Sequence, residues 1–177
     1  MDYLQQGTFE NGFYWLFDAS DQRYVAYCDL ASEPGAAWTL AMSWDITSKD
    51  IPQFKCKAFR QDAPINYNTP NWYSYRQTLA RMKSIRSRST YWRATCSFDE
   101  MQWSMSKMGT VSYRDYLRGK ISNFDIMTYH GDGQCLPVDY VNIRGNAASA
   151  TTAPFWQVRD RYALHIDSNH TDCAFRP

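Results

Sequence analysis

The sequence predicts an α+β fold, in which an antiparallel β-sheet forms the core and two or so short helices and long loops complete the chain. Three observations lead to this prediction. Aromatic residues make up 16% of the 177 residues. They fall in short runs bounded by Asp, Asn, Gly, Pro and Ser, a pattern typical of paired strands. The best helical spacing is confined to one stretch, residues 71–88.

The first three strands are predicted within residues 11–44. Two aromatic runs, residues 13–17 and 24–28, flank a polar break whose Asp and Ser side chains can bond their own backbone. A third run, residues 37–44, follows a Glu-Pro-Gly turn. This order predicts a three-stranded β-meander whose aromatic side chains fill a core.

The order of these residues resembles the opening subdomain of fibrinogen-related domains, the fold of fibrinogen C-terminal globules, ficolins and intelectins. The resemblance implies one domain over residues 1–177, with an N-terminal subdomain at 1–45 and a central and short or divergent C-terminal part at 46–177. It also implies that Trp38 is a core residue. The matching residues are Gly12, Phe13, Tyr14, Tyr27, Cys28, Asp29, Leu30, Trp38, Thr39 and Leu40.

The predicted helix at residues 71–88 begins at Asn71 as N-cap and carries an apolar stripe that includes Tyr75 and Met82. From Trp72 to Arg93 the chain has six basic residues and no acidic one. Such a face either binds an anionic glycan or nucleic acid, or is simply solvated. A net charge of only +1 favours the solvated face.

The rest of the chain is predicted from alternation and turn signals. The expected elements are strands at 54–59, 91–98, 100–104, 124–129, 138–143 and 162–166, a helix at 112–119, a tight turn at 130–134 and a small-residue loop at 145–154.

Composition and motifs exclude several classes of function. The small net charge argues against a global role with nucleic acid or membrane, and no apolar run reaches membrane-spanning length. No nucleophile elbow, phosphate loop, dinucleotide fingerprint or His-Glu-x-x-His motif occurs, so we do not expect an enzyme. We expect a secreted protein whose signal peptide is not present in this chain.

Five widely spaced cysteines form no Cys-x-x-Cys pair. The alternatives are reduced thiols in a cytosolic protein or disulfides in a secreted one. The family resemblance implies disulfides, with Cys28 left unpaired and two bridges among the other four, connected in one of three ways. These four are Cys56, Cys96, Cys135 and Cys173.

Two polar segments in the C-terminal half are candidate binding sites. Tyr129, His130 and Asp132 lie in the first, and the tail contains His170, which could contact the same kind of ligand. Such mixtures of polar and aromatic side chains suit sugars. The tail also offers oxygen ligands suited to Ca²⁺, although a polar loop without metal is the alternative. These ligands are Asp167, Asn169 and Asp172.

Asn169 also begins an N-glycosylation sequon, which suits secretion. The resemblance implies a secreted recognition module that binds glycans or acetylated groups, or an extracellular protein, in adhesion or innate recognition, with a homo-oligomer as one arrangement. The alternative is a structural or adhesive matrix protein with the same fold and no small-ligand site. An enzyme of unrecognised type is the third hypothesis.

Overall fold

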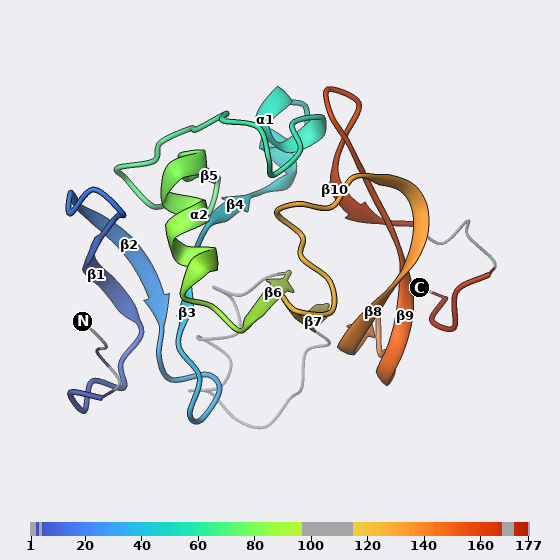
Figure 1. Ribbon diagram of the computed structural model, residues 1–177, viewed down its shortest axis with the longest axis horizontal. Helices are drawn as coiled ribbons and strands as arrows, with labels where there is room; N and C mark the ends of the chain where they lie inside the picture. Colours follow the sequence, from blue (N-terminus) through green and yellow to red (C-terminus); the bar gives the residue numbers. More distant parts are fainter. Residues whose placement is uncertain (1–2, 4, 97–114, 168–171, 177) are drawn as a thin grey trace. The chain divides into compact units, whose positions relative to one another are not determined.

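The computed structural model describes residue 3 and residues 5–96, 115–167 and 172–176. The chain divides into two compact units (Figure 1). Unit 1 comprises residues 1–55 and 61–88, and unit 2 comprises residues 56–60 and 89–177. Antiparallel strands dominate both units and helices are short, as the sequence predicted. The expectation of a single domain with a subdomain at 1–45 stays a prediction.

A three-stranded antiparallel meander opens unit 1, in the order β1 (Gly12–Phe17), β2 (Arg23–Asp29) and β3 (Trp38–Thr39). The first two predicted strands are confirmed, and so is the turn between them, where the Asp18 carboxylate accepts from the backbone amides of Ser20 and Gln22. Trp38 is half-buried rather than fully enclosed.

Alternation along β1 leaves its outward side chains uncovered. Phe13, Trp15 and Phe17 are 62%, 49% and 47% exposed, and the Arg23 guanidinium lies 4.2 Å from the Trp15 ring centroid. We call these three aromatic residues the β1 stripe. Period two in a strand places all three on one face.

The expected single strand at 37–44 is wrong, because the chain changes sheets after β3. The next strand, β4 (Met42–Trp44), pairs with β5 (Ser74–Arg76) instead. This second pairing shortens the predicted helix at 71–88. The α-helix α2 (Leu79–Ser87) begins only after Thr78, whose hydroxyl accepts from the Arg81 amide.

Asn71, predicted as the helix N-cap, makes a turn instead. Its side-chain oxygen accepts from the amides of Tyr73 and Ser74, which satisfies the same donors that a helix would leave open. The predicted apolar stripe of the helix does not include Tyr75, because this residue is fully buried in β5 and does not lie on a helix face.

The strand expected at 54–59 is wrong, because a short helix ends at Lys55 and residues 56–59 form no strand. The 3₁₀ helix η1 (Ile46–Ser48) is capped by Asp45, and α1 (Pro52–Lys55) follows directly. Pro at the first position of α1 has no amide to leave unsatisfied there. Local turn chemistry therefore determines this segment.

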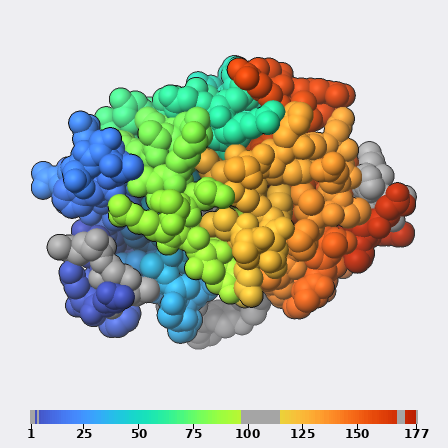
Figure 2. All heavy atoms as spheres, in the orientation of Figure 1, coloured from blue at the N-terminus to red at the C-terminus, as the bar shows by residue number. Residues whose placement is uncertain are grey.

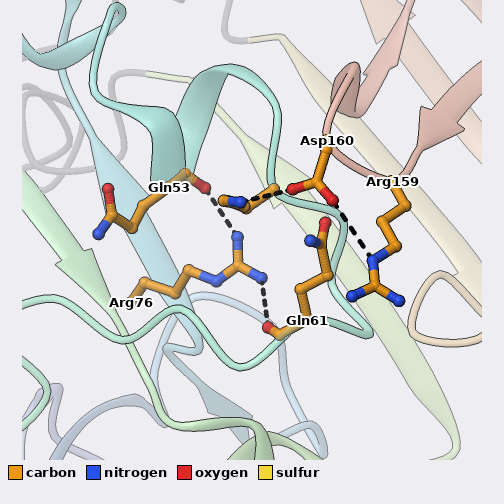
Figure 3. A network of polar contacts seen from close by, with 6 residues as sticks. Gln53, Gln61, Arg76, Arg159 and Asp160 are labelled. Carbon is orange, nitrogen blue, oxygen red and sulfur yellow. Dashed lines mark hydrogen bonds and ion pairs between the residues drawn. The ribbon is translucent and has the colours of Figure 1, made fainter.

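Arg76 joins two segments of unit 1, at Gln53 and at Gln61 (Figure 3). Its guanidinium is 1% exposed and donates to the carbonyl oxygens of Gln53, at 2.7 Å, and Gln61, at 3.0 Å. Burial lowers the pKa of Arg76 to about 10, so the group stays charged at neutral pH.

Unit 2 is built on a five-stranded antiparallel sheet in the order β10-β9-β8-β7-β6. Figure 2 shows β8 and its flanking turns, in orange, as a continuous surface of this unit. The strands are β6 (Tyr91–Thr95), β7 (Tyr116–Lys120), β8 (Gly131–Ile143), β9 (Asn146–Val158) and β10 (Tyr162–Ile166).

A long hairpin of β8 and β9 corrects two predictions. The loop expected at 145–154 is strand, since a two-residue turn at Arg144 and Gly145, with φ of 50° and 87°, returns the chain immediately. The tight turn expected at 130–134 is the start of β8, where a bulge at Gly133 shifts the register. The strand at 138–143 is confirmed within β8, and 162–166 is confirmed as β10.

Two more predicted elements are wrong. Residues 124–129 form turns, because the Asp125 carboxylate binds the Met127 amide and the Asp125 carbonyl accepts from Tyr129. The described part of the helix expected at 112–119 is strand β7. The strand at 91–98 is confirmed as β6, which covers its first five residues. The strand expected at 100–104 lies outside the described residues.

Aromatic side chains fill the core of unit 2. Trp92 donates its indole N–H to the Phe124 carbonyl at 2.7 Å and packs edge-on against Phe124 and Phe155. Gly119 faces Trp92 so closely that a Cβ there would lie 2.7 Å from the ring. The cluster contains Trp92, Leu117, Phe124, Val138, Val141, Ala153, Phe155 and Phe175.

Gln157 joins three segments of unit 2 through one fully buried side chain. Its Oε1 accepts from the Phe59 amide at 2.9 Å. Its Nε2 donates to the carbonyls of Ile126, at 2.9 Å, and Tyr129, at 2.8 Å. Residues 56–60 and the turns before β8 are thus attached to β9 by the hydrogen bonds of one fully buried side chain.

A disulfide between Cys135 and Cys173 attaches the tail to β8. The Phe175 amide then donates to the Thr152 carbonyl at 2.9 Å. The prediction that Cys28 is unpaired is confirmed, since its thiol is free and buried. The expected second bridge does not form, because the Cys96 thiol is also free.

Candidate functional site

A row of three side chains crosses one end of the unit 2 sheet. Asp132 on β8 is the register partner of Trp156 on β9, which is in turn the partner of His165 on β10. Directly opposed residues of neighbouring strands project from the same face. We call Asp132, Trp156 and His165 the β8–β10 row.

Aromatic contacts order the row and its neighbours. The Trp156 and His165 rings stack with an interplanar angle of 13° and centroids 5.6 Å apart. Tyr162 meets the His165 ring edge-on at 5.5 Å. The two rings are nearly parallel, each leaves its outer face for a ligand, and the contact with Tyr162 restricts the position of the imidazole.

An ion pair borders the aromatic surface. Arg161 lies over the Tyr162 ring at 4.7 Å and approaches the Asp132 carboxylate with an N–O distance of 3.5 Å. Both charged side chains are more than half exposed. A pair so exposed contributes little to stability, and its oxygen and nitrogen atoms remain accessible to a ligand.

The His165 imidazole has a defined tautomer in its neutral form. Its Nδ1 lies 2.9 Å from the Ala163 carbonyl oxygen. A carbonyl oxygen only accepts hydrogen bonds, so Nδ1 carries the proton and Nε2 presents a lone pair. Nε2 can therefore accept a hydrogen bond from a hydroxyl group.

Among the predicted ligand residues that the structure describes, Asp132 alone joins the row. Tyr129 donates its hydroxyl to the Phe155 carbonyl at 2.6 Å, and burial raises its pKa, so this side chain has a structural role. His130 is exposed on the turn before β8. His170 lies outside the described residues.

Two of the three tail residues predicted as calcium ligands lie within the described part of the chain. Asp167 follows β10 and Asp172 precedes the disulfide cysteine, both exposed, while Asn169 lies outside the described residues. No group of three or more His, Cys, Asp or Glu side chains suited to a metal occurs among the residues described.

Sequence reasoning missed Trp156, Arg161, Tyr162 and His165. The strand at 162–166 was predicted, but no side chain of it was predicted to take part in a site. What local pattern could not supply was the register between β9 and β10, because β9 was predicted to be a loop up to Pro154.

Comparison with models of known families, with curated proteins and with solved structures gives no match. Within the described residues, no helix combines the length and apolar character that a membrane crossing requires.

The arrangement suits noncovalent recognition of a polar ring. The stacked rings can cover an apolar face, while Asp132, Arg161 and His165 Nε2 offer an anionic acceptor, a donor and a neutral acceptor. Flat aromatic surface with hydrogen-bonding groups at its border is the chemistry that a sugar ring or an acetamido group requires.

Proposed function

We propose that this chain is a secreted recognition module that binds glycans or acetylated groups through the β8–β10 row. The observation that carries the proposal is the stack of Trp156 on His165, bordered by the Asp132–Arg161 pair. The resemblance of residues 11–44 to fibrinogen-related domains supports the same class of function. The Cys135–Cys173 disulfide is in keeping with an oxidising compartment.

The structural or adhesive alternative has an observation of its own. The β1 stripe exposes three large aromatic side chains on an edge strand of its sheet. Exposed edge strands and apolar patches favour association with another chain. Sedimentation of the full chain, compared with a Phe13→Thr, Trp15→Thr variant, tests this alternative directly.

Titration calorimetry of the full chain with a panel of N-acetylated and neutral oligosaccharides tests the recognition proposal. We expect Trp156→Ala to weaken binding at least tenfold and Asp132→Asn to weaken it several-fold. Trp15→Ala is a matched control, because it removes a half-exposed indole from unit 1. Equal loss in the control, or no binding by folded wild-type protein, contradicts the proposal.

Calcium at the tail stays part of the proposal and has its own measurement. Titration with Ca²⁺ alone, on wild type and on Asp167→Ala with Asp172→Ala, asks whether these carboxylates supply ligands. Sugar binding that persists in chelator and in the double variant would separate the β8–β10 row from any metal.

Secretion and modification are tested on protein collected unreduced from the medium of expressing cells. Mass spectrometry is expected to find the Cys135–Cys173 peptide pair and a glycan on Asn169. Retention of the whole product inside the cell, with both thiols reduced, would contradict the proposed location.

A further inference from the structure

The open edge of β1 carries exposed aromatic side chains and outward backbone groups on the same three residues. Among the described residues, β2 is the one strand that pairs with β1. Just beyond the two strands, the Asp18 amide donates to the Gln22 carbonyl. Bonds to a neighbouring antiparallel strand alternate along the chain, so from Asp18 they fall on every second residue back to Gly12. The N–H and C=O groups of the β1 stripe therefore point away from β2.

A contact of Tyr3 confirms this direction. The Tyr3 hydroxyl donates to the Trp15 carbonyl oxygen at 2.8 Å, and the Tyr3 ring lies beside Tyr14 with centroids 4.7 Å apart. The Trp15 oxygen is therefore accessible from the open side of β1. One hydroxyl supplies a single donor, whereas a paired strand would supply alternating donors and acceptors along the whole edge.

β1 lacks the features by which an edge strand usually avoids pairing. Protected edge strands are very short, or they contain charged residues, proline or a bulge. The six residues of β1 are all uncharged, none is proline, and their register with β2 is continuous. The three side chains of the β1 stripe are 47–62% exposed. The strand is therefore suited to pairing with another strand.

The order of residues in β1 matches an antiparallel copy of the same strand. A two-fold axis at Trp15 places Phe13 opposite Phe17 of the second copy, and Trp15 opposite its own equivalent. Tyr14 then lies opposite Leu16 on the other face. Exposed residues meet exposed residues, and half-buried residues meet half-buried ones. Aromatic pairs directly opposed across two strands stabilise a sheet.

Charge and area also suit a pair of identical chains. Arg23, the cation over Trp15, is on β2, so its two copies would be about three strand spacings, or about 14–15 Å, apart. That separation exceeds the Debye length of about 8 Å at physiological ionic strength. At about 150–250 Å² for each aromatic side chain, the β1 stripe leaves about 300 Å² accessible in each copy. With the backbone edges added, two copies approach the lower end of the roughly 1,200–2,000 Å² that stable interfaces bury, so we expect reversible association.

We propose that two copies of this chain associate through β1, antiparallel and centred on Trp15, so that the two meanders form one six-stranded sheet. The Trp15 amide of each copy replaces the Tyr3 hydroxyl as the donor to the Trp15 carbonyl of the other. A two-fold contact uses the open β1 edge of both copies, so the assembly closes at two. This inference goes beyond the adhesive alternative, which names no partner, and does not depend on the β8–β10 row.

Sedimentation equilibrium of the full chain tests the proposal, over about a hundredfold range of concentration centred on the micromolar values that small interfaces give. We expect a monomer–dimer equilibrium. Trp15→Lys should weaken the dimer at least tenfold, because it places two like charges opposite each other at the centre of the pairing. Tyr3→Phe should strengthen the dimer several-fold, because it removes the competing donor at the Trp15 carbonyl.

A matched control separates this edge from general apolar attraction. Tyr73 is 66% exposed in unit 1 and lies outside the meander, so Tyr73→Lys should leave association within twofold. Equal loss in this control overturns the proposal. Circular dichroism checks that each variant folds. If Trp15→Lys does not fold, Phe17→Pro, which removes an outward N–H and no bond to β2, must weaken the dimer several-fold.

Cysteine cross-linking tests the register, in a Cys96→Ser background that removes an exposed thiol. Opposed residues of a hydrogen-bonded pair have Cα atoms about 5.5 Å apart, which a disulfide can span. Trp15→Cys should therefore link two copies, whereas Phe13→Cys alone should not, because Phe17 of the second copy lies opposite it.

The remaining outcomes decide between a closed pair and other arrangements. A monomer at every concentration would leave the β1 stripe to a different partner and overturn the proposal. An open-ended series of larger species, or equal cross-linking at positions 13 and 15, would also overturn it. Trp156→Ala should leave the dimer unchanged, so failure at the β8–β10 row and failure here are distinguished.

Discussion

Replacing Gln157 by Leu removes the three hydrogen bonds of a fully buried side chain of unit 2 in one substitution. The Phe59 amide and the carbonyls of Ile126 and Tyr129 lose their contacts of 2.9, 2.9 and 2.8 Å, of which the first is buried and the other two are partly buried. Each buried polar group left unsatisfied costs about 1–3 kcal/mol. We expect the free energy of unfolding to fall by about 3–6 kcal/mol, measured by urea denaturation followed by tryptophan fluorescence.

Two further variants show whether hydrogen bonding causes this loss. Gln157→Glu keeps an acceptor for the Phe59 amide but turns a carboxylate toward two carbonyls, so it should also destabilise unit 2 at neutral pH. Gln22→Leu makes the same change at an exposed position and should stay within about 0.5 kcal/mol of wild type. A Gln157→Leu protein within about 1 kcal/mol of wild type would refute the reasoning.

Three other predictions follow from packing, ionisation and cross-linking. Gly119→Ala should cost about 1–3 kcal/mol in urea denaturation, because its Cβ would lie 2.7 Å from the Trp92 ring. Burial raises the pKa of the Cys28 thiol from 9.0 to about 11, so the folded protein keeps a proton that the unfolded chain releases. The contribution of this thiol to the free energy of unfolding is fully present below pH 9 and falls by about 2–3 kcal/mol as the pH rises to 11. The Cys28→Ala protein should lack this decline when the two proteins are compared by urea denaturation at each pH. Replacing Cys135 and Cys173 by Ser should cost about 4 kcal/mol, from a sequence separation of 38 residues, and a wild-type melting temperature in that variant would contradict it.

The first two strands and the last could be predicted because each carries its own local signal. β1 and β2 combine dense aromatics with an Asp-rich turn, and β10 begins and ends at the predicted residues. β9 could not be predicted from its composition, since its small residues are held in strand by pairing with β8 rather than by their own propensity.

The first part of the predicted helix and most of the site were predicted wrongly, for reasons that also lie outside the local sequence pattern. Tyr75 has helical spacing with Leu79, yet pairing of β5 with β4 buries it in a sheet. Asp132 was predicted because it lies in a locally polar segment of the sequence. Its neighbours Trp156 and His165 are brought beside it only by the register of three strands. Local periodicity does not contain that register.

The path of the chain between the two units limits how this protein can be divided into fragments. Residues 56–60 belong to unit 2, although the chain on both sides of them belongs to unit 1. A fragment that ends at Arg88 would carry Phe59 without the Gln157 oxygen that its amide requires, and a fragment that begins at Ser89 would lack that donor. A single cut in the chain therefore cannot separate the two units, because the residues of unit 2 lie on both sides of the unit 1 segment 61–88.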